Sequence, residues 1–322
     1  MMSRNLLIDK FKGLAIILVV WGHCMQFCTK NDVLNNKLYE MIYTFHMPFF
    51  MAISGYLYYF SINKRSLKEL IEARIKQLLI PFLIWSFLYL LVFRWEVSHS
   101  LVEWIKNYIY NLPFFFWFIW SLLLSSLSVM VINKLFKDSL IAYLILFILI
   151  LLLPNGLGFY YTKYMIPYFF AGYLVHKYQL KTNNIIFVFS LIVFLVLWYF
   201  WKNEYYIYTT EMALKPNDLK GIYDDCYRYV AGFTGIIVSI TLIKKLPNLK
   251  LFETLGRNTL PIYFISSFLN SYLYLFRLPY QHFLYSFVYT PFITVIVIAF
   301  CMGISMLIDK NKTINQYLLG GR

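Results

Sequence analysis

The sequence predicts an all-helical polytopic membrane protein, with about ten transmembrane helices around a polar intramembrane site. Three observations support this fold class. Hydrophobic residues make up 61% of the chain and charged residues only 14%, whereas a soluble domain carries about 25% charge. Apolar runs long enough to cross a bilayer recur along the whole chain. The first two runs also carry ionisable side chains, which are rare in membrane helices and functional by default.

Ten spans are expected, each an apolar run that ends at a polar or charged segment. The first span carries charges within it and lacks a small-residue cleavage site, so we interpret it as a spanning helix and not as a signal peptide. The sixth is short and is expected to be tilted, broken or extended toward Tyr178. No loop is long enough for a soluble domain, so a single integral-membrane domain is expected over residues 1–322. The spans are 6–28, 41–60, 78–93, 112–132, 139–153, 164–176, 185–201, 227–243, 258–276 and 283–308.

The distribution of charge sets the expected orientation. Of the 29 Lys and Arg residues, 17 fall in the loops and termini on the side of the N-terminus, ten fall on the other side, and Lys10 and Lys12 lie in the first span. Cytoplasmic loops carry an excess of Lys and Arg, so both termini, with Arg4 and Arg322, are expected in the cytoplasm. Membrane lipid headgroups then account for most of the net charge of +14, and no nucleic-acid partner is expected.

The first span places three ionisable residues on one helical face. Asp9, Lys12 and His23 share a stripe, which is expected to face the interior of the bundle and not lipid. Lys12 and His23 are eleven residues apart, about 16–17 Å along a helix axis. His23 and His46 are then expected at similar depth in the outer half of the membrane. Asp9, Lys12 and the basic segment 65–76 are expected at the inner face.

These residues carry a resemblance to a known family. A cation, ten residues and a His, followed by FHMPFFMAISGY at 45–56, resemble the acyltransferase-3 family of polytopic membrane acyltransferases, which O-acylate bacterial surface glycans. The chain looks most like the short stand-alone members, the sugar O-acetylases and polysaccharide O-succinyltransferases. Further matches cover nearly the whole chain: Arg74 before LLIPFLIW, the Trp-Phe pair at 117–118, IPYFFAGYLV at 166–175 and LGRNTLPIYF at 255–264.

Two departures from the family bear on the site. The family usually has Arg where this chain has Lys12, and Lys keeps the positive charge without the bidentate guanidinium. The family often has His where this chain has Ser266, so a role for that second imidazole does not carry over.

Position and resemblance together predict a catalytic group of His23, Asp9 and His46. Acyl transfer from a thioester to a sugar hydroxyl needs a base for the hydroxyl proton, and His23 is expected in that role. The alternative for His23 is a packing residue bonded to a neighbouring helix. His46 is expected either to orient the substrate or to cap the irregularity that Pro48 makes in its helix. Asp9 is expected to pair with Lys12, which lowers the cost of burying both.

The expected donor is acetyl-CoA or another acyl-CoA, whose phosphates need an anchor on the cytoplasmic side. Lys12, Arg74 and Lys76 are the candidates, and the alternative is that the last two belong to an ordinary basic inner loop. Four further residues are expected to line the substrate site, although Ser54-Gly55 is also typical of a small-residue helix contact. These four are Ser54, Trp117, Asn258 and Tyr263.

The predicted function is O-acylation at the cell inner membrane, with acetyl as the expected group and a hydroxyl of a cell-surface glycan or lipid-linked sugar as acceptor. The rival hypothesis is a membrane transporter or glycan flippase that uses the same buried polar residues as a proton or substrate path. A non-catalytic assembly subunit would leave the polar stripe unexplained. No metal is expected, because Cys24 and Cys28 beside His23 are interpreted as small packing residues.

Overall fold

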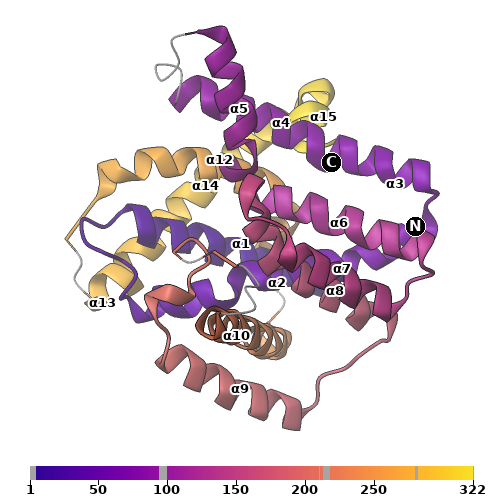
Figure 1. Ribbon diagram of the computed structural model, residues 1–322. Coiled ribbons are helices and arrows are strands. Elements are labelled where there is room, and N and C mark those ends of the chain that lie inside the picture. The colour runs from indigo at the N-terminus through magenta and orange to yellow at the C-terminus, as the bar shows by residue number, and fades with distance from the viewer. Residues whose placement is uncertain are drawn as a thin grey trace.

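The computed structural model describes residues 5–93, 100–209, 211–212, 218–247, 249–279 and 282–321. Arg4 and Arg322, which the charge count includes, lie outside the described residues. Helices are the regular elements of the described chain, which has an isolated bridge between Thr29 and Leu278 in place of any strand, so the predicted fold class is confirmed as all-α. The helices form one bundle, with α1 and α2 running through its middle (Figure 1).

The helical elements, with 3-10 and π segments labelled η, leave few long connections between them. They are α1 (Leu6–Phe27), α2 (Lys37–Lys64), α3 (Leu67–Arg74), η1 (Ile75–Leu79), α4 (Ile80–Phe93), α5 (Leu101–Phe115), α6 (Trp117–Leu135), α7 (Leu140–Leu152), η3 (Gly156–Gly158), α8 (Phe159–Lys177), α9 (Asn184–Tyr199), η4 (Asn203–Tyr205), α10 (Leu219–Lys245), α11 (Lys250–Arg257), α12 (Thr259–Leu269), η5 (Asn270–Phe276), α13 (His282–Leu284), η6 (Tyr285–Tyr289), α14 (Thr290–Asp309) and α15 (Lys312–Leu319).

Four of these stretches are long and apolar enough to cross a membrane by length and composition. Both α1 and α2, with 22 and 28 residues, also have the length of a crossing helix, but they carry more polar side chains. The count of about ten crossings therefore stays a prediction. The four apolar stretches are Leu67–Phe93, Trp117–Leu135, Leu219–Lys245 and Tyr285–Asp309.

Several helix boundaries differ from the expected spans for local reasons. The basic segment 65–76 is mostly helical and not a loop, because Ser66 and Glu69 form a capping box at the start of α3. This helix then continues through η1 into α4. The expected span 112–132 is divided at Phe116, where the backbone leaves the helical region, three residues after Pro113, which lacks an N–H donor.

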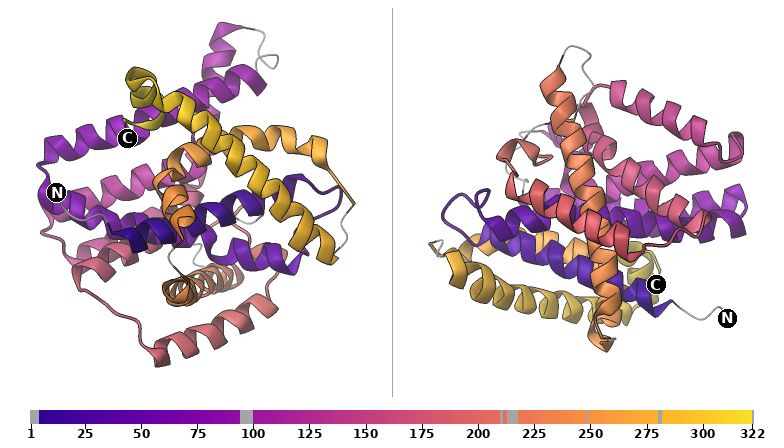
Figure 2. Two further views of the ribbon diagram at one scale, coloured as in Figure 1. Left: turned by 180° about the vertical axis from the view of Figure 1, so that it is seen from behind. Right: turned by 90° about the horizontal axis from the view of Figure 1, so that it is seen from below.

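The central helices pack closely and the peripheral ones expose apolar surface. Here α2 packs on α8, and α1 packs on α11 and α2. On the periphery, α7 and α9 expose many of their Leu, Ile, Val and Phe side chains, as helices that face lipid do. Both ends of the described chain lie toward the same end of the bundle in all views (Figures 1 and 2). Which side of a membrane this end faces stays a prediction.

A buried arginine ties the segment 203–209 to the bundle. Arg228 of α10 is fully buried; its Nε donates to the Tyr205 carbonyl at 3.0 Å and its Nη2 to the Glu204 carbonyl at 2.7 Å. Its Nη1 lies 2.9 Å from the Asp225 carboxylate. Removing one partner from such a buried pair is strongly destabilising, so this cluster anchors the segment that carries Tyr208 toward the site.

Candidate active site

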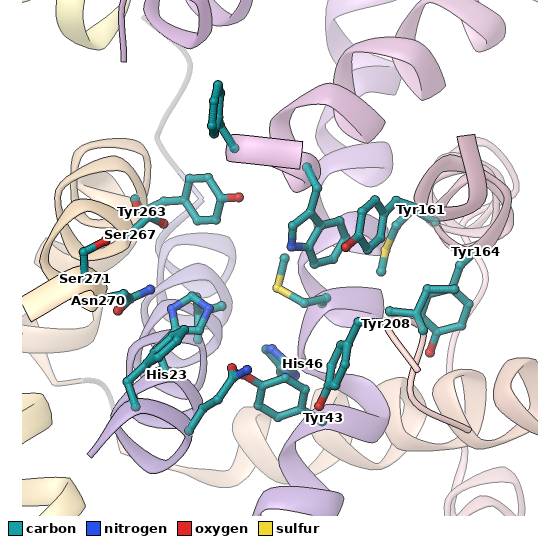
Figure 3. Close-up of a pocket in the computed structure, with 18 of the residues that line it drawn as sticks. His23, Tyr43, His46, Tyr161, Tyr164, Tyr208, Tyr263, Ser267, Asn270 and Ser271 are labelled. Atoms are coloured by element: carbon teal, nitrogen blue, oxygen red, sulfur yellow. Dashed lines mark hydrogen bonds between the residues drawn. The ribbon is translucent and has the colours of Figure 1, made fainter. Parts of the chain in front are cut away.

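A cavity of about 440 Å³ lies inside the bundle beside the C-terminal half of α1. Side chains from α1, α2, α6, α8, α12 and the segment 207–208 contribute to its walls. Figure 3 shows His23 from α1 and His46 from α2 in this cavity, with Tyr263 from α12 on the same wall as His23. We call it the outer cavity, because the expected orientation places it toward the outside. The structure brings together the two imidazoles that the sequence places at similar depth.

The two imidazoles differ in their hydrogen bonds. His46 is 3% exposed, and its Nδ1 lies 2.7 Å from the carbonyl oxygen of Ile42. A carbonyl oxygen only accepts, so Nδ1 carries a proton and the lone pair of the neutral ring is on Nε2. Pro48 has no N–H, so the Thr44 carbonyl lacks its helical donor. The His46 ring bonds Ile42 and not this carbonyl. The Nδ1 atom of His23 is buried and has no hydrogen-bond partner among the described residues.

His23 lines the outer cavity, and its Nδ1 lacks the hydrogen bond that a buried polar atom usually makes. A buried polar atom without a partner costs about 1–3 kcal/mol. A hydroxyl bound in the outer cavity would supply the missing hydrogen bond, which is also the contact that a general base makes with its substrate. This nitrogen makes no bond to a neighbouring helix among the described residues, and the role of His23 stays a prediction.

The walls of the outer cavity combine aromatic faces with polar side chains. Trp117 stacks on Tyr161 with ring centroids 4.6 Å apart and 22° between the ring planes. Gln26 accepts a hydrogen bond of 3.0 Å from the Tyr43 hydroxyl. A polar strip runs from the end of α12 along the 3-10 helix η5. Its last residue, Arg277, has the only permanent charge among the described residues that line the outer cavity. The strip consists of Ser267, Asn270, Ser271 and Arg277.

A second cavity, of about 380 Å³, lies toward the other end of α1 and has three cationic side chains. Lys12 of α1, Arg74 of α3 and Arg257 of α11 line it, and no acidic residue does so among the described residues. We call it the inner cavity. Its charge favours an anionic ligand, since clefts lined by one sign of charge concentrate the opposite one.

Arg74 is positioned where its helix becomes irregular. Its guanidinium carbon lies 4.4 Å from the ring centroid of Tyr58, within cation–π distance. The π-helix η1 begins at the next residue, Ile75, and such single π-turns are frequent at functional sites. The Nε of Arg74 is buried and unpartnered within the described chain. The guanidinium therefore keeps a donor for a ligand.

Arg257 is a cation of the inner cavity that the sequence analysis leaves out of the site. It reaches the cavity because α11 crosses α1 closely: a Cβ on Gly13 would collide with the Phe252 carbonyl, and one on Gly256 with the Asp9 carbonyl. The crossing sets the Nε of Arg257 3.7 Å from the Oδ2 of Asp9. The sequence does contain a signal for this residue, because Arg257 belongs to the motif LGRNTLPIYF.

The two cavities meet inside the bundle. Val19, Met47 and Tyr263 line both of them, and these side chains are 1%, 7% and 8% exposed. We call the place where these three side chains lie the junction. These three side chains thus lie between the cations of one cavity and the imidazoles of the other, beside the stretch of α1 between Lys12 and His23.

Three of the four expected substrate-binding residues line a cavity. Trp117 and Tyr263 line the outer cavity and Ser54 the inner one. The structure also separates the two interpretations of the Ser54-Gly55 pair. A Cβ on Gly55 would collide with the backbone of Phe169 in α8, so the glycine makes the helix contact and the serine is left to the cavity.

Three expected site residues line neither the outer nor the inner cavity. Asp9 is fourteen residues from His23, about 21 Å along α1, and pairs with Arg257. Lys76 lies beyond the inner cavity, with its Nζ 3.6 Å from the Glu72 carboxylate. Asn258 lies where α11 ends and α12 begins. Their roles stay predictions.

Comparison with known proteins identifies a family and two curated relatives. The acyltransferase-3 family model, described as "Acyltransferase domain", matches residues 5–306. The nodulation protein NolL of Sinorhizobium fredii is 34% identical over 182 residues, which cover 53% of this chain and 49% of the relative. NolL of Mesorhizobium japonicum is 29% identical over 183 residues, covering 53% and 48%. The chain spans about half the length of these curated relatives. No solved structure matches.

Proposed function

This chain belongs to the acyltransferase-3 family, and from that premise we propose that it is a membrane O-acyltransferase. It would move an acyl group, with acetyl as the expected one, from acyl-CoA to a hydroxyl of a cell-surface glycan or its lipid-linked precursor. The observation that carries the proposal is the pair of adjacent cavities that share three lining residues, with cations at the inner end and two imidazoles at the outer end.

The donor would enter from the inner end. Acyl-CoA is made in the cytoplasm, and its diphosphate is the anion that Lys12, Arg74 and Arg257 would bind. The uncharged pantetheine arm would then extend toward the junction. There Met47 and Tyr263 would surround the thioester and keep its carbonyl within reach of the outer cavity.

The reaction would use His23 as a general base. The acceptor hydroxyl gives its proton to the imidazole as its oxygen attacks the thioester carbonyl. The new C–O bond forms, the C–S bond breaks, and the leaving thiolate takes the proton back from the imidazolium. For His46 we propose an orienting role, in which the lone pair on Nε2 accepts a hydrogen bond from another acceptor hydroxyl.

The outer cavity has the chemistry that a sugar acceptor requires. Sugars present hydroxyls that hydrogen-bond and C–H faces that pack on aromatic rings. Gln26, Asn270 and Ser271 would serve the hydroxyls, and the stacked pair Trp117–Tyr161 offers an aromatic face. This lining supports a glycan acceptor. We propose that it approaches from the outer side of the cell inner membrane, because the distribution of Lys and Arg favours both termini of the single domain in the cytoplasm.

Asp9 is proposed as a positioning residue and not as one that touches the reacting atoms. Its distance of about 21 Å from His23 along α1 keeps it away from the acceptor, and its partner Arg257 lines the inner cavity.

The test uses purified protein in lipid nanodiscs with acetyl-CoA and a cell-envelope glycan fraction. We expect free thiol to be released only when the acceptor is present, and an acetylated glycan to appear by mass spectrometry. Surface glycans from cells with and without the protein should differ by the same acyl group. Glycan movement across the bilayer without thioester consumption would favour the transporter instead.

A further inference from the structure

The inner cavity shares part of its wall with another hollow. Gln77, Gly320 and Gly321 line both the inner cavity and a groove of about 600 Å³. The groove lies between the end of α3 with η1 on one side and the C-terminal helix α15 on the other, and Figure 1 shows α15 next to α4. We call it the C-terminal groove.

The lining of the C-terminal groove is hydrophilic, with a cation on each side. Lys76 comes from η1 and Lys312 from the first position of α15. Lys76 lies 3.6 Å from Glu72, whereas Lys312 has no acidic partner within the described residues. The single acid of the described lining, Asp309, accepts a hydrogen bond of 2.5 Å from the Asn315 side chain. One oxygen of this carboxylate is therefore occupied by the Asn315 amide.

The wall formed by α15 is docked firmly against the bundle. The indole of Trp85 in α4 donates to the Leu318 carbonyl at 2.9 Å, and Leu319 is buried. Gly320 ends the helix at φ +76°, a left-handed conformation that suits glycine. A Cβ at Gly320 would also collide with the Gln77 backbone. These contacts fix the position of α15, so this wall of the groove is a packed part of the fold.

We infer that the C-terminal groove binds the phosphorylated adenosine end of the acyl-CoA donor, with Lys312 and Lys76 facing its 3′-phosphate. The inference rests on the proposed function. CoA carries its negative charge at the nucleotide end and none on its pantetheine arm. The protein has its sites in the order of these parts of CoA. The hydrophilic groove comes first, the inner cavity follows, and the junction lies beyond it. Their described linings together contain one acid and five cations: Lys12, Arg74, Lys76, Arg257 and Lys312.

The experiment compares CoA with 3′-dephospho-CoA. Binding of each is measured by calorimetry to the whole protein in nanodiscs of zwitterionic lipid, so that anionic headgroups do not compete. We expect the wild type to prefer CoA by about tenfold, the factor that corresponds to one charge-assisted contact. Lys312→Ala should lose this preference while its affinity for 3′-dephospho-CoA stays the same. Lys310→Ala is the matched control: Lys310 is exposed nearby but does not line the groove, so this variant should keep the preference.

Other outcomes separate the inference from the proposed function. If Lys312→Ala and the double variant Lys76→Ala/Lys312→Ala both keep the preference for CoA, the groove is not the nucleotide site, although the donor assignment stands. If the wild type binds neither compound, the proposed function itself fails. A variant that loses binding to anionic lipid, with an unchanged ratio between the two ligands, would assign the groove to lipid headgroups and overturn the inference.

Discussion

The Nε of Arg257 lies 3.7 Å from the Oδ2 of Asp9, where α11 crosses α1. Asp9 is buried, whereas the Arg257 side chain is 46% exposed and lines the inner cavity. The pair connects an acid predicted for catalysis to a cation proposed for donor binding. Kinetics of variants at this pair can therefore distinguish a catalytic role of Asp9 from a role in positioning Arg257.

If Asp9 positions Arg257, the two residues should act on donor binding as one unit. Asp9→Asn and Arg257→Gln should each raise the KM for acyl-CoA by about fivefold, because a partly exposed charge contact contributes up to ~1 kcal/mol. The double variant should be hardly worse than either single one. Steady-state kinetics with varied donor measures this, and a lower kcat in Asp9→Asn at unchanged KM would restore Asp9 to catalysis.

Lys12 is predicted to bind an anionic part of the donor. Lys12→Ala should raise the donor KM by about ten- to a hundredfold, as expected for a charge-assisted contact of ~1.5–3 kcal/mol. Lys12→Arg should stay close to the wild type, since the family usually has Arg there. Equal losses in both variants together with poor expression would indicate a structural pair with Asp9.

His23 is predicted to be the general base. His23→Ala should insert and fold normally, because removing a polar group from a membrane helix eases insertion. Single-turnover acyl transfer should fall by about 10²–10⁴, the usual contribution of a positioned base. Donor affinity should barely change, since Lys12 lies some 16 Å away along α1 by helix rise and Arg74 and Arg257 line the other cavity. The matched variant His46→Ala should cost less or act mainly on acceptor KM. A His23→Ala protein that binds donor and transfers at the wild-type rate would refute the mechanism.

Met47 is predicted to limit the size of the acyl group, because it lines the junction between the two cavities. Met47→Ala should raise the ratio of butyryl to acetyl transfer by about tenfold, since a methylene in an apolar pocket changes discrimination by ~1–3 kcal/mol. Met51 is buried one turn later and lines neither cavity, so Met51→Ala is the control for lost packing. The same change of ratio in both variants would exclude the junction as the selective point.

The orientation predicts the behaviour of fused reporters. A reporter active only in the cytoplasm should be active after Arg322 and silent in the segment 202–226. The physical reason is the excess of Lys and Arg on the side of the termini. The opposite pattern would reverse the membrane sides assigned to donor and acceptor.

Much of the site follows from local sequence patterns. The stripe of α1 predicts that Lys12 and His23 face the interior, and they line the inner and outer cavities. Apolar runs predict most of the helices, because burial of apolar side chains and internal backbone bonding hold regardless of the partner helix. Helix boundaries are less predictable. The charges of 65–76 suggest a loop, yet the capping box of Ser66 and Glu69 makes that segment helical.

The sequence by itself determines the all-helical class, the polar stripe of α1 and the family, because these depend on composition, period and motif. Only the tertiary structure decides that Arg257 lies beside Asp9 and that Gly320 lies against Gln77. Both contacts join segments more than two hundred residues apart. They exist because glycines allow two backbones to approach where any Cβ would collide. A local sequence pattern does not predict which two segments approach each other in this way.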